Sequence, residues 1–222
     1  LAPTDAAGEN PRPDLGADVI NNSWTCPASE GCTSPDILRS VVENVRAAGI
    51  AVVFAAGNSG SSCSTISDAP AFYDAVITVG ATEANDTIAP FSSIGPVLAD
   101  GSNRLKPDLT APGVRVRTAA PSDGYAGSFS GTSAAAPHVT GAVALLWSAF
   151  PALAGDVDRT EEALERGAAP RTVDLTCGGY AGTEVPNPVY GWGRLDVEGA
   201  YEWLAPPRSA VVPLGRRPPT RL

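Results

Sequence analysis

Short apolar runs and one amphipathic segment alternate along the first third of the chain. Residues 18–23 (DVINNS) predict a short strand, and residues 50–56 and 75–81 are continuous apolar runs. Runs of this kind, rich in β-branched residues, are typical of strands that are buried on both faces. Strands that alternate with helices indicate βαβ units and a mostly parallel sheet.

An amphipathic helix is expected between the first two of these strands. Ser34 has the residue type of a helix N-cap, Pro35 suits the first helical position, and Gly49 is a typical helix end. The apolar residues of this segment that fall on one helical face are Ile37, Leu38, Val41, Val42 and Val45. The pattern therefore predicts a helix that begins at Pro35 and carries this apolar face.

The second half of the chain reads as loops followed by helices. Residues 91–127 contain the stretches SSIGP, KPD, APG and PSDG, which predict loops and short strands. The pattern becomes helical from about residue 132 to residue 150, and a final helix is expected at residues 160–166, with Gly167 as its end. Residues 205–222 are rich in proline and arginine, so we expect a flexible tail or linker there.

Composition restricts the classes of function. The 222 residues suffice for one domain with a tail, and 43% hydrophobic with 18% charged residues indicate a globular chain. No apolar run approaches the ~20 residues of a membrane-spanning helix, so no membrane partner is expected. The formal charge of −9 repels nucleic-acid phosphates. Neither a basic stripe nor a GxGxxG or P-loop motif is present, which argues against nucleic-acid and nucleotide binding.

The four cysteines leave their pairing open. Cys26 and Cys32 bracket a short loop that a disulfide could close, and no CxxC or histidine cluster accompanies them to favour a metal site. Cys63 and Cys177 could pair with each other or stay free. An oxidising, extracellular or cell-envelope location is favoured. No charged-then-apolar leader opens the sequence, so an export signal would have been removed or would lie outside it.

One serine stands where a loop meets the start of a helix. In the sequence GTSAAAPHV, Ser133 follows Gly131, and the free amide N–H groups of a helix start would stabilise an oxyanion beside it. His138, the only histidine, is five residues further on, which is about 140° around the helix and about 7.5 Å along it. We therefore expect Ser133 to suit a nucleophile and His138 to be a packed structural histidine rather than its base. Alternatively, Ser133 is the N-cap of a helix packed on the sheet.

Several motifs, in order, resemble the subtilisin-like serine proteases, or subtilases. GTSAAAPHVTG is similar to the family's nucleophile motif, VVFAAGNSG (residues 52–60) to its oxyanion-hole motif, and DVINNSW (residues 18–24) to the strand that lines its substrate cleft. FSSIGP, KPDLTAPG and YGWGRLD match further landmarks, so the likeness covers about residues 15–204. It implies an α/β fold, a three-layer sandwich with a mostly parallel sheet, incomplete at its amino-terminal side.

The resemblance implies a set of residues for the hydrolysis of peptide bonds. Ser133 matches the nucleophile that forms an acyl-enzyme, and Asn58 matches the side-chain donor of the oxyanion hole. Thr25 stands where the family usually has glycine, and its β-branched side chain intrudes on the cleft. The residues implied for binding a polypeptide substrate are Ser23, Trp24 and Thr25 along the substrate strand, and Ala55, Ala56 and Gly57 in one wall of the specificity pocket.

Two further regions are matched more loosely. Asp68 falls near the place where the family's specificity pocket ends, where a buried carboxylate would favour a basic residue before the cut bond and an exposed one would be only a loop acid. Ala71, Tyr73 and Val76 match a region where some relatives bind a weak cation through backbone oxygens. Backbone ligation leaves no side-chain signature, so we expect no cofactor and assign no metal, although family members often bind structural calcium.

The residues that would activate the serine are missing. In the family, an aspartate and a histidine upstream of the substrate strand do so, and no motif of either kind occurs in this sequence. Residues 1–204 are therefore interpreted as the carboxyl-terminal portion of a subtilase catalytic domain, whose missing amino-terminal part is a partner. The alternatives are a split enzyme with a partner chain, and a non-catalytic scaffold that binds peptides or proteins. We expect the chain alone to be inactive, and prone to aggregation through open strand edges.

Overall fold

A parallel sheet forms the centre of the computed structural model, which describes residues 2–60, 62–121 and 123–205. Its strands, in spatial order, are β1 (Val19–Asn22), β2 (Ala51–Ala55), β3 (Ile77–Thr82) and β4 (Leu109–Pro112). Each neighbouring pair is parallel, so the carboxyl ends of the strands meet at one edge of the sheet. The expected α/β fold with a mostly parallel sheet is confirmed.

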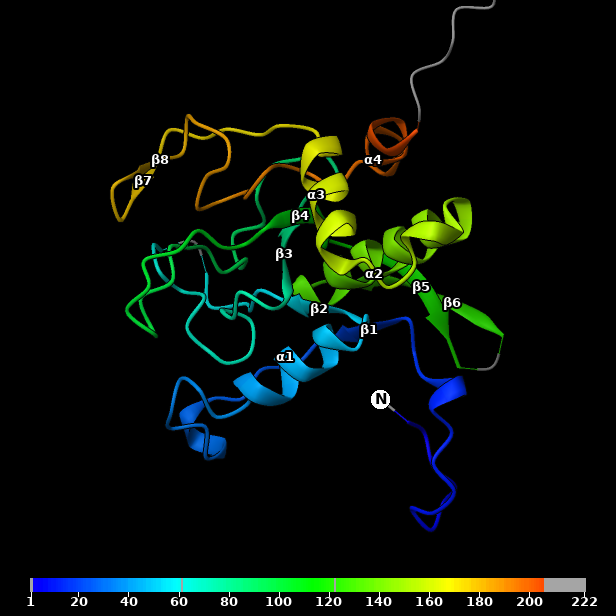
Figure 1. Ribbon diagram of the computed structural model, residues 1–222. Coiled ribbons are helices and arrows are strands. Elements are labelled where there is room, and N and C mark those ends of the chain that lie inside the picture. The colour runs from blue at the N-terminus through cyan, green and yellow to red at the C-terminus, as the bar shows by residue number, and fades with distance from the viewer. Residues whose placement is uncertain (1, 61, 122, 206–222) are drawn as a thin grey trace, which may run out of the picture.

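Helices cover both faces of this sheet (Figure 1). They are α1 (Arg39–Ala47), α2 (Thr132–Ala149), α3 (Val157–Gly167) and α4 (Val197–Leu204). Consecutive residues of β2 point to the two opposite faces of the sheet. Val53 lies in a core cluster with residues of α2, whereas Phe54 lies in a cluster with Val42 of α1. The layers are therefore helix, sheet and helix. None of the described helices is long and apolar enough to cross a membrane.

Shorter elements surround the sheet. Strands β5 (Val116–Ala120) and β6 (Gly124–Phe129) form an exposed antiparallel hairpin just before α2, in keeping with the loops and short strands expected there. Strands β7 (Thr176–Cys177) and β8 (Tyr180–Ala181) form a second antiparallel pair. The 3₁₀-helices are η1 (Pro13–Leu15), η2 (Ala28–Glu30) and η3 (Pro151–Leu153).

The first predicted helix begins later than expected. Residues 35–38 form turns, and α1 starts at Arg39. The Ser34 hydroxyl accepts a hydrogen bond from the backbone of Asp36, and the Tyr73 hydroxyl accepts one from the backbone of Leu38. These side chains satisfy amides that a helix would leave free at its start, so the turn is stable without helical hydrogen bonds.

The apolar face predicted for this helix is only partly buried. Val42 is buried, and Leu38 and Val45 pack against the same cluster. Ile37 is 45% exposed and lies in the turns before α1, and Val41 is 60% exposed, so only part of the predicted apolar face is covered. The spacing of apolar residues identified the helix, but it did not show which of these residues pack against the sheet.

The helix expected to be the last is followed by another. Helix α3 covers the predicted segment. Helix α4 follows it in a segment for which no helix was predicted. Asp196 caps α4 by accepting a hydrogen bond from the backbone of Gly199, and Ala200 packs into the main core. The tail predicted for residues 205–222 lies outside the described residues, apart from residue 205.

One stripe of α2 is apolar and uncovered. The exposed residues of α2 are Pro137, His138, Gly141, Ala144, Leu145, Ser148 and Ala149, and apart from His138 and Ser148 they are apolar. Leu145 alone is 63% exposed. In the described part of the chain, no strand pairs with β1 on the side away from β2. A cavity of about 450 Å³ lies between this edge and α2, and Val19 and Ala144 are among the residues that line it.

We predict that the isolated chain self-associates through these surfaces, because an open strand edge and an apolar stripe are both unpaired. Light scattering after size exclusion should show species larger than a monomer, and Leu145→Glu should lower their proportion. A monomer with a sharp, reversible two-state unfolding transition would contradict this prediction.

Candidate active site

Ser133 is the second residue of α2 and is half-buried. Gly131, the residue before the helix, has a φ of 151°, a backbone conformation that favours glycine. The amide of Ser133 belongs to the first helical turn, whose N–H groups have no partner within the helix. Within the described residues, the Thr132 amide donates to Asn58 and the Ala134 amide to the Gly131 carbonyl oxygen, which leaves the Ser133 amide as the donor beside its own hydroxyl at the positive end of the helix dipole.

Asn58 lies just beyond the carboxyl end of β2 and faces the start of α2. Its Oδ1 accepts hydrogen bonds from the backbone N–H of Thr132 at 2.9 Å and from the Thr132 hydroxyl at 3.0 Å. The Thr132 hydroxyl in turn accepts a hydrogen bond from the backbone of Gly57 at 3.2 Å. Because Oδ1 is engaged and no hydrogen bond of Nδ2 occurs within the described residues, the Asn58 Nδ2 amide is left as a donor near the start of α2.

The structure thus identifies Thr132 as a residue of the site that sequence analysis did not single out. Thr132 is fully buried and contacts both segments that carry the proposed reaction groups. The only sequence signal was its position immediately before Ser133, in the segment that resembles the family's nucleophile motif.

A buried serine fixes the backbone on both sides of Asn58. The Ser93 hydroxyl accepts a hydrogen bond from the backbone of Ser59 at 3.0 Å. The backbone N–H of Ser93 donates to the carbonyl of Gly57, also at 3.0 Å. A Cβ at Gly57, where φ is 102°, would lie 3.0 Å from the Ser93 hydroxyl oxygen. The close approach and the positive φ together require glycine at this position.

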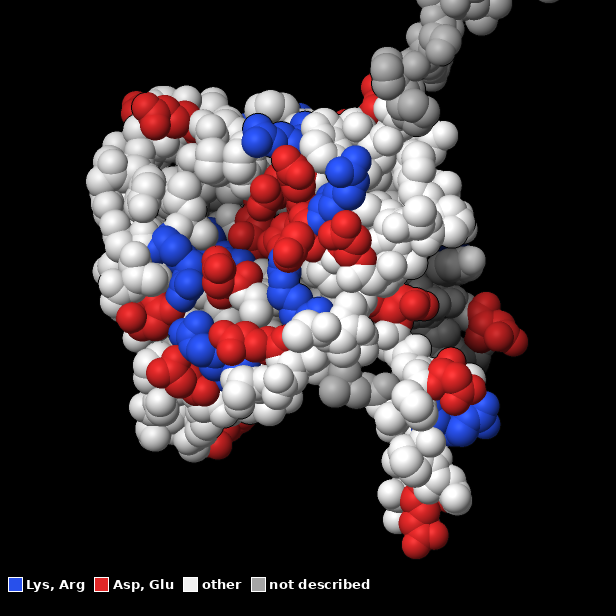
Figure 2. Space-filling model, viewed as in Figure 1, with Lys and Arg blue, Asp and Glu red and all other residues white. Residues whose placement is uncertain are grey.

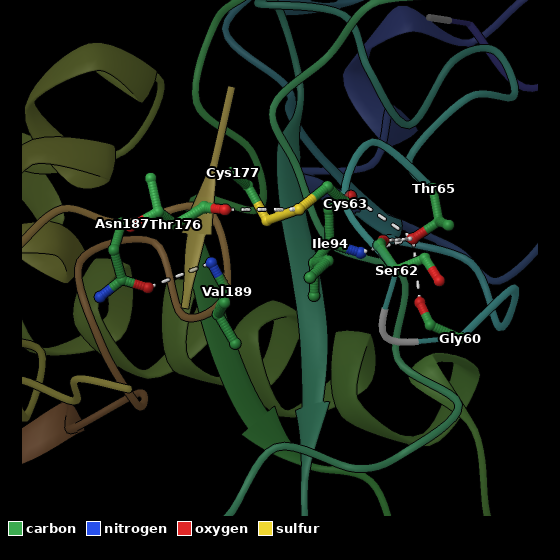
Figure 3. The surroundings of a disulfide bond; sticks show 9 residues. All are labelled: Gly60, Ser62, Cys63, Thr65, Ile94, Thr176, Cys177, Asn187 and Val189. Atoms are coloured by element: carbon green, nitrogen blue, oxygen red, sulfur yellow. Dashed lines mark hydrogen bonds between the residues drawn. A yellow bond between two sulfur atoms is a disulfide. The ribbon is translucent and has the colours of Figure 1, made fainter. Parts of the chain in front are cut away.

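The loop that follows is closed by Thr65 and by a disulfide (Figure 3). The Thr65 hydroxyl donates to the carbonyl oxygens of Gly60 and Ser62, at 2.9 and 3.0 Å. Cys63 is bonded to Cys177 of β7, which is 114 residues away along the chain. The loop after Asn58 is therefore tied to a distant part of the fold, in addition to its local hydrogen bonds. This cross-link and the Cys26–Cys32 disulfide resolve both pairings that the sequence left open.

The segment expected to bind substrate begins beside the serine. The Ser23 hydroxyl donates to the carbonyl oxygen of Ser133 at 3.2 Å. Trp24 is 49% exposed and packs edge-on against Phe54, with ring centroids 5.2 Å apart. Thr25 is half-buried. The structure therefore brings the Ser23 end of this segment to the nucleophile.

The expected wall of the specificity pocket offers backbone rather than side chains. Ala55 and Ala56 are buried, and their side chains lie in the two core clusters on opposite faces of the sheet. Gly57 has no side chain and is half-buried. Asp68 lines a pocket with Cys26 and Cys32 that includes none of these three residues. The structure thus does not bring Asp68 together with the expected wall in one pocket.

Comparisons with known proteins identify relatives of this chain. A sequence model of the subtilase family matches residues 4–193. The chain belongs to the subtilase family. It is 38% identical over 200 residues to bacillopeptidase F of Bacillus subtilis (strain 168), covering 88% of this chain and 13% of that protein. It is 47% identical over 140 residues to subtilisin DY of Bacillus licheniformis, covering 62% of this chain and 45% of that protein.

A solved structure shares the fold of this subtilase chain. The prenylagaramide maturation protease PagA superposes with a TM-score of 0.66 at 26% identity, over 87% of this chain and 64% of that chain. The chain therefore spans less than half of the length of the two curated relatives above, and less than two thirds of PagA.

The only histidine of this subtilase chain is not buried, which corrects the expectation of a packed residue. His138 is exposed on α2, and its Nδ1 lies 2.9 Å from the carbonyl oxygen of Ala134. Since a carbonyl only accepts, Nδ1 is the donor of that hydrogen bond. Ser133 and His138 line the same cavity of about 260 Å³. Within the described residues, no hydrogen bond joins the two side chains. The expected packing was wrong because the side of α2 that carries His138 is uncovered.

The region matched to a weak cation site in relatives does not fit a cation here. The carbonyl oxygen of Ala71 accepts a hydrogen bond from the Thr78 hydroxyl at 2.6 Å. The carbonyl oxygen of Val76 accepts one from the Lys106 ammonium at 2.7 Å. Lys106 is only 2% exposed. A buried ammonium group thus already provides positive charge beside these backbone oxygens.

Acidic and basic side chains gather on the face where α1 and α3 lie (Figure 2), and the buried Lys106 forms an ion pair with Asp108. Asp108, Glu161 and Glu165 place carboxylate oxygens within 4.8 Å of one another, a spacing that could hold a metal ion. However, Lys106 contacts Asp108 at 2.5 Å and Arg46 contacts Glu161 at 2.6 Å. Side-chain cations therefore already compensate two of the three carboxylates.

Glu165 is the uncompensated member of this network. Burial, followed by the charges of Glu161 and Asp108, raises the pKa of Glu165 from 4.5 to about 7. The folded state therefore holds a proton that the unfolded state releases. The stability associated with this proton is fully present below pH 4.5 and is lost as the pH rises towards 7.

We predict that Glu165→Gln removes this pH dependence. At pH 8 the variant should unfold with a free energy higher than that of the unchanged protein by about 2–3 kcal/mol, since one pKa unit corresponds to about 1.4 kcal/mol. Denaturant titration of the full-length protein between pH 5 and 8 measures the difference, and the exposed neighbour Glu162→Gln is the matched control. Parallel pH profiles for all three proteins would disprove the raised pKa.

Proposed function

We propose that this chain supplies the nucleophile and the oxyanion-binding groups of a serine endopeptidase. The Ser133 oxygen attacks the carbonyl carbon of a peptide bond, and the resulting oxyanion is held by the Asn58 Nδ2 amide and the backbone N–H of Ser133. The serine proton passes to the base and from there to the leaving nitrogen as the bond to that nitrogen breaks, and water then hydrolyses the acyl-enzyme, releases the acid product and restores the Ser133 hydroxyl. No cofactor is required for these steps.

One observation carries this proposal. Thr132 engages the Oδ1 of Asn58 through two donors, at 2.9 and 3.0 Å, which leaves the Asn58 amide hydrogens for another acceptor. The adjoining residue is Ser133, at the amino end of a helix. A nucleophile, a backbone donor and a side-chain donor are therefore gathered at one point. This is the set of groups that acyl transfer needs, apart from the acid and the base.

We infer that the acid and the base come from a segment upstream of these residues in the complete protein. His138 is the only histidine, and its Nδ1 is engaged by the carbonyl oxygen of Ala134. The cavity of about 260 Å³ beside Ser133 provides space for an incoming imidazole ring. The uncovered stripe of α2 and the free edge of β1 provide a surface on which such a segment would dock. The chain alone would then lack normal turnover.

The cross-links support a proposal for the location of the protein. Two disulfides join residues within the described part of the chain. Disulfides persist in oxidising compartments. We therefore propose that the protein acts outside the cell or exposed on the cell envelope, on polypeptide substrates.

A fluorophosphonate probe tests the proposed nucleophile, because the probe reacts with an activated serine. We predict labelling at Ser133 when the chain is joined to an upstream segment that carries the aspartate and histidine motifs, and little labelling without that segment. Ser133→Ala is the control for the site of reaction. An unlabelled but folded complex would instead support the alternative of a non-catalytic, peptide-binding scaffold.

Asn58→Ala tests the oxyanion donor in the same joined protein. We expect kcat to fall by about 10²–10³ with little change in KM, a magnitude measured for the corresponding donor in a subtilisin rather than one calculated for this chain. Ser59→Ala is the matched control, because the Ser59 side chain is exposed and only its backbone binds Ser93. An equal loss in both variants would show that the loop, and not the amide, is responsible.

A further inference from the structure

A disulfide follows directly after the segment expected to bind substrate, residues 23–25. Cys26 is the next residue, and it is bonded to Cys32, six residues further on. The backbone N–H of Cys26 also donates to the carbonyl oxygen of Ala69 at 2.7 Å. Cys26 is therefore held at two points, by a covalent bond and by a hydrogen bond, and it is the fixed end of the segment.

The backbone of the segment itself is largely unpaired. In the described part of the chain, neither Trp24 nor Thr25 takes part in a hydrogen bond through its main chain. Trp24 is anchored through its side chain, which packs against Phe54 and donates from Nε1 to Asn22. Unpaired main-chain groups are available to an extended peptide that pairs with the segment. The shape of the segment is therefore set by the contacts at its two ends.

The loop that the disulfide closes is otherwise held by its own backbone. Among the described residues, the backbone hydrogen bonds of residues 27–32 are all made within residues 27–33, and the longest, from Cys32 to Pro27, measures 3.4 Å. Residues 28–31 are exposed. The far end of the loop is thus joined to Cys26 mainly through the disulfide bond. From Cys32 the chain continues into the turns that precede α1.

The two disulfides of the chain differ in what they hold together. The Cys63–Cys177 disulfide joins residues 114 apart in the sequence, whereas Cys26 and Cys32 are six apart. In the chain-entropy model, a disulfide stabilises the folded state more when it closes a longer loop. The main effect of the Cys26–Cys32 disulfide is therefore on local order beside residues 23–25 rather than on global stability.

We propose that the Cys26–Cys32 disulfide holds residues 23–25 in the conformation that pairs with an extended polypeptide. Resting on the proposed function, the proposal makes this disulfide a positioning element for the binding of substrate and not for the chemistry at Ser133. When the disulfide is open, the ligand has to order the segment as it binds. A site that is ordered beforehand binds more tightly, because that entropy was lost on folding.

A protein with one reducible disulfide isolates this effect. The chain, joined to its upstream segment, carries Cys63→Ser and Cys177→Ser, so that Cys26–Cys32 is the disulfide that remains in it. Ser133→Ala is added so that binding is measured without turnover. A dithiol then attacks one sulfur to form a mixed disulfide, and its second thiolate releases the protein. The protein gains two thiols, and the dithiol leaves as a cyclic disulfide.

The probe for binding is the oxidised B chain of insulin with a fluorescent label, a polypeptide whose sulfonic acids a dithiol does not alter. Fluorescence anisotropy gives its Kd. We expect the Kd to rise about tenfold on reduction and to return on reoxidation, since ordering the backbone of one residue costs a factor of roughly 5–30 in an equilibrium constant. With Cys63 and Cys177 intact, Cys26→Ser together with Cys32→Ser should give the weaker affinity with or without the dithiol.

The reactivity of the serine is measured on the same proteins with Ser133 restored. The fluorophosphonate reacts at the serine and does not extend along residues 23–25, so its rate of labelling should change less than about twofold on reduction. For a peptide substrate, KM should rise and kcat should stay within the same twofold range. A purely structural effect of the disulfide would lower the labelling rate and the affinity together.

The outcomes separate this proposal from the proposed function. A Kd that the dithiol leaves unchanged, or a labelling rate that falls in parallel with the affinity, would overturn the role of the disulfide. Binding that depends on the disulfide, with a Ser133 that never reacts, would support that role and reject the peptidase. A reactive Ser133 with binding that is insensitive to the dithiol would support the peptidase and reject the role of the disulfide.

Discussion

The candidate active site depends on the contact between Asn58 and Thr132, because this contact joins two segments that are far apart in the sequence. Asn58 follows a strand, and Thr132 begins a helix that packs across the whole sheet. The two hydrogen bonds to Oδ1 set the direction of the Asn58 amide group, and the same threonine precedes the serine. One buried side chain therefore positions Ser133, the proposed nucleophile, and Asn58, the proposed side-chain donor, relative to each other. Catalysis by preorganised donors requires this fixed arrangement.

The parallel sheet makes that contact possible. Because β1 and β2 are parallel neighbours, Ser23 and Asn58 emerge at the same edge, and α2 begins there as well. The loop that carries Asn58 is held by hydrogen bonds to Ser93, and the Cys63–Cys177 disulfide ties the residues that follow it to β7. A loop with free ends would lose conformational entropy on binding a transition state, whereas this loop has lost it on folding.

Sequence patterns predicted the elements that burial determines. Strands β2 and β3 were found because both of their faces are buried, which leaves continuous apolar runs. The start of α1 was misplaced because its N-terminal amides bind side chains, one of them the distant Tyr73. His138 was wrongly expected to be packed, because helical spacing gives the direction of a side chain but not whether another segment covers it.

Within the candidate site, the resemblance to a family led to Ser133 and Asn58, and the structure brings both to one place. Thr132 was missed because its role lies in hydrogen bonds across 74 residues of sequence, which no local pattern reveals. Asp68 was assigned by position alone, whereas its surroundings place it beside a disulfide loop and apart from residues 55–57. The sequence thus led to the candidate residues Ser133 and Asn58, and the geometry was needed to identify the residues that hold them in place.

The most direct test of this account is a crystal structure of the full-length protein after reaction with a phosphonate that mimics the tetrahedral intermediate. The account predicts a bond from phosphorus to the Ser133 oxygen. It also predicts that one phosphonate oxygen lies within hydrogen-bonding distance of both the Asn58 Nδ2 and the Ser133 backbone nitrogen, with Oδ1 still on Thr132. An adduct whose oxygen avoids Asn58, or an Asn58 amide turned so that Nδ2 faces Thr132, would contradict it.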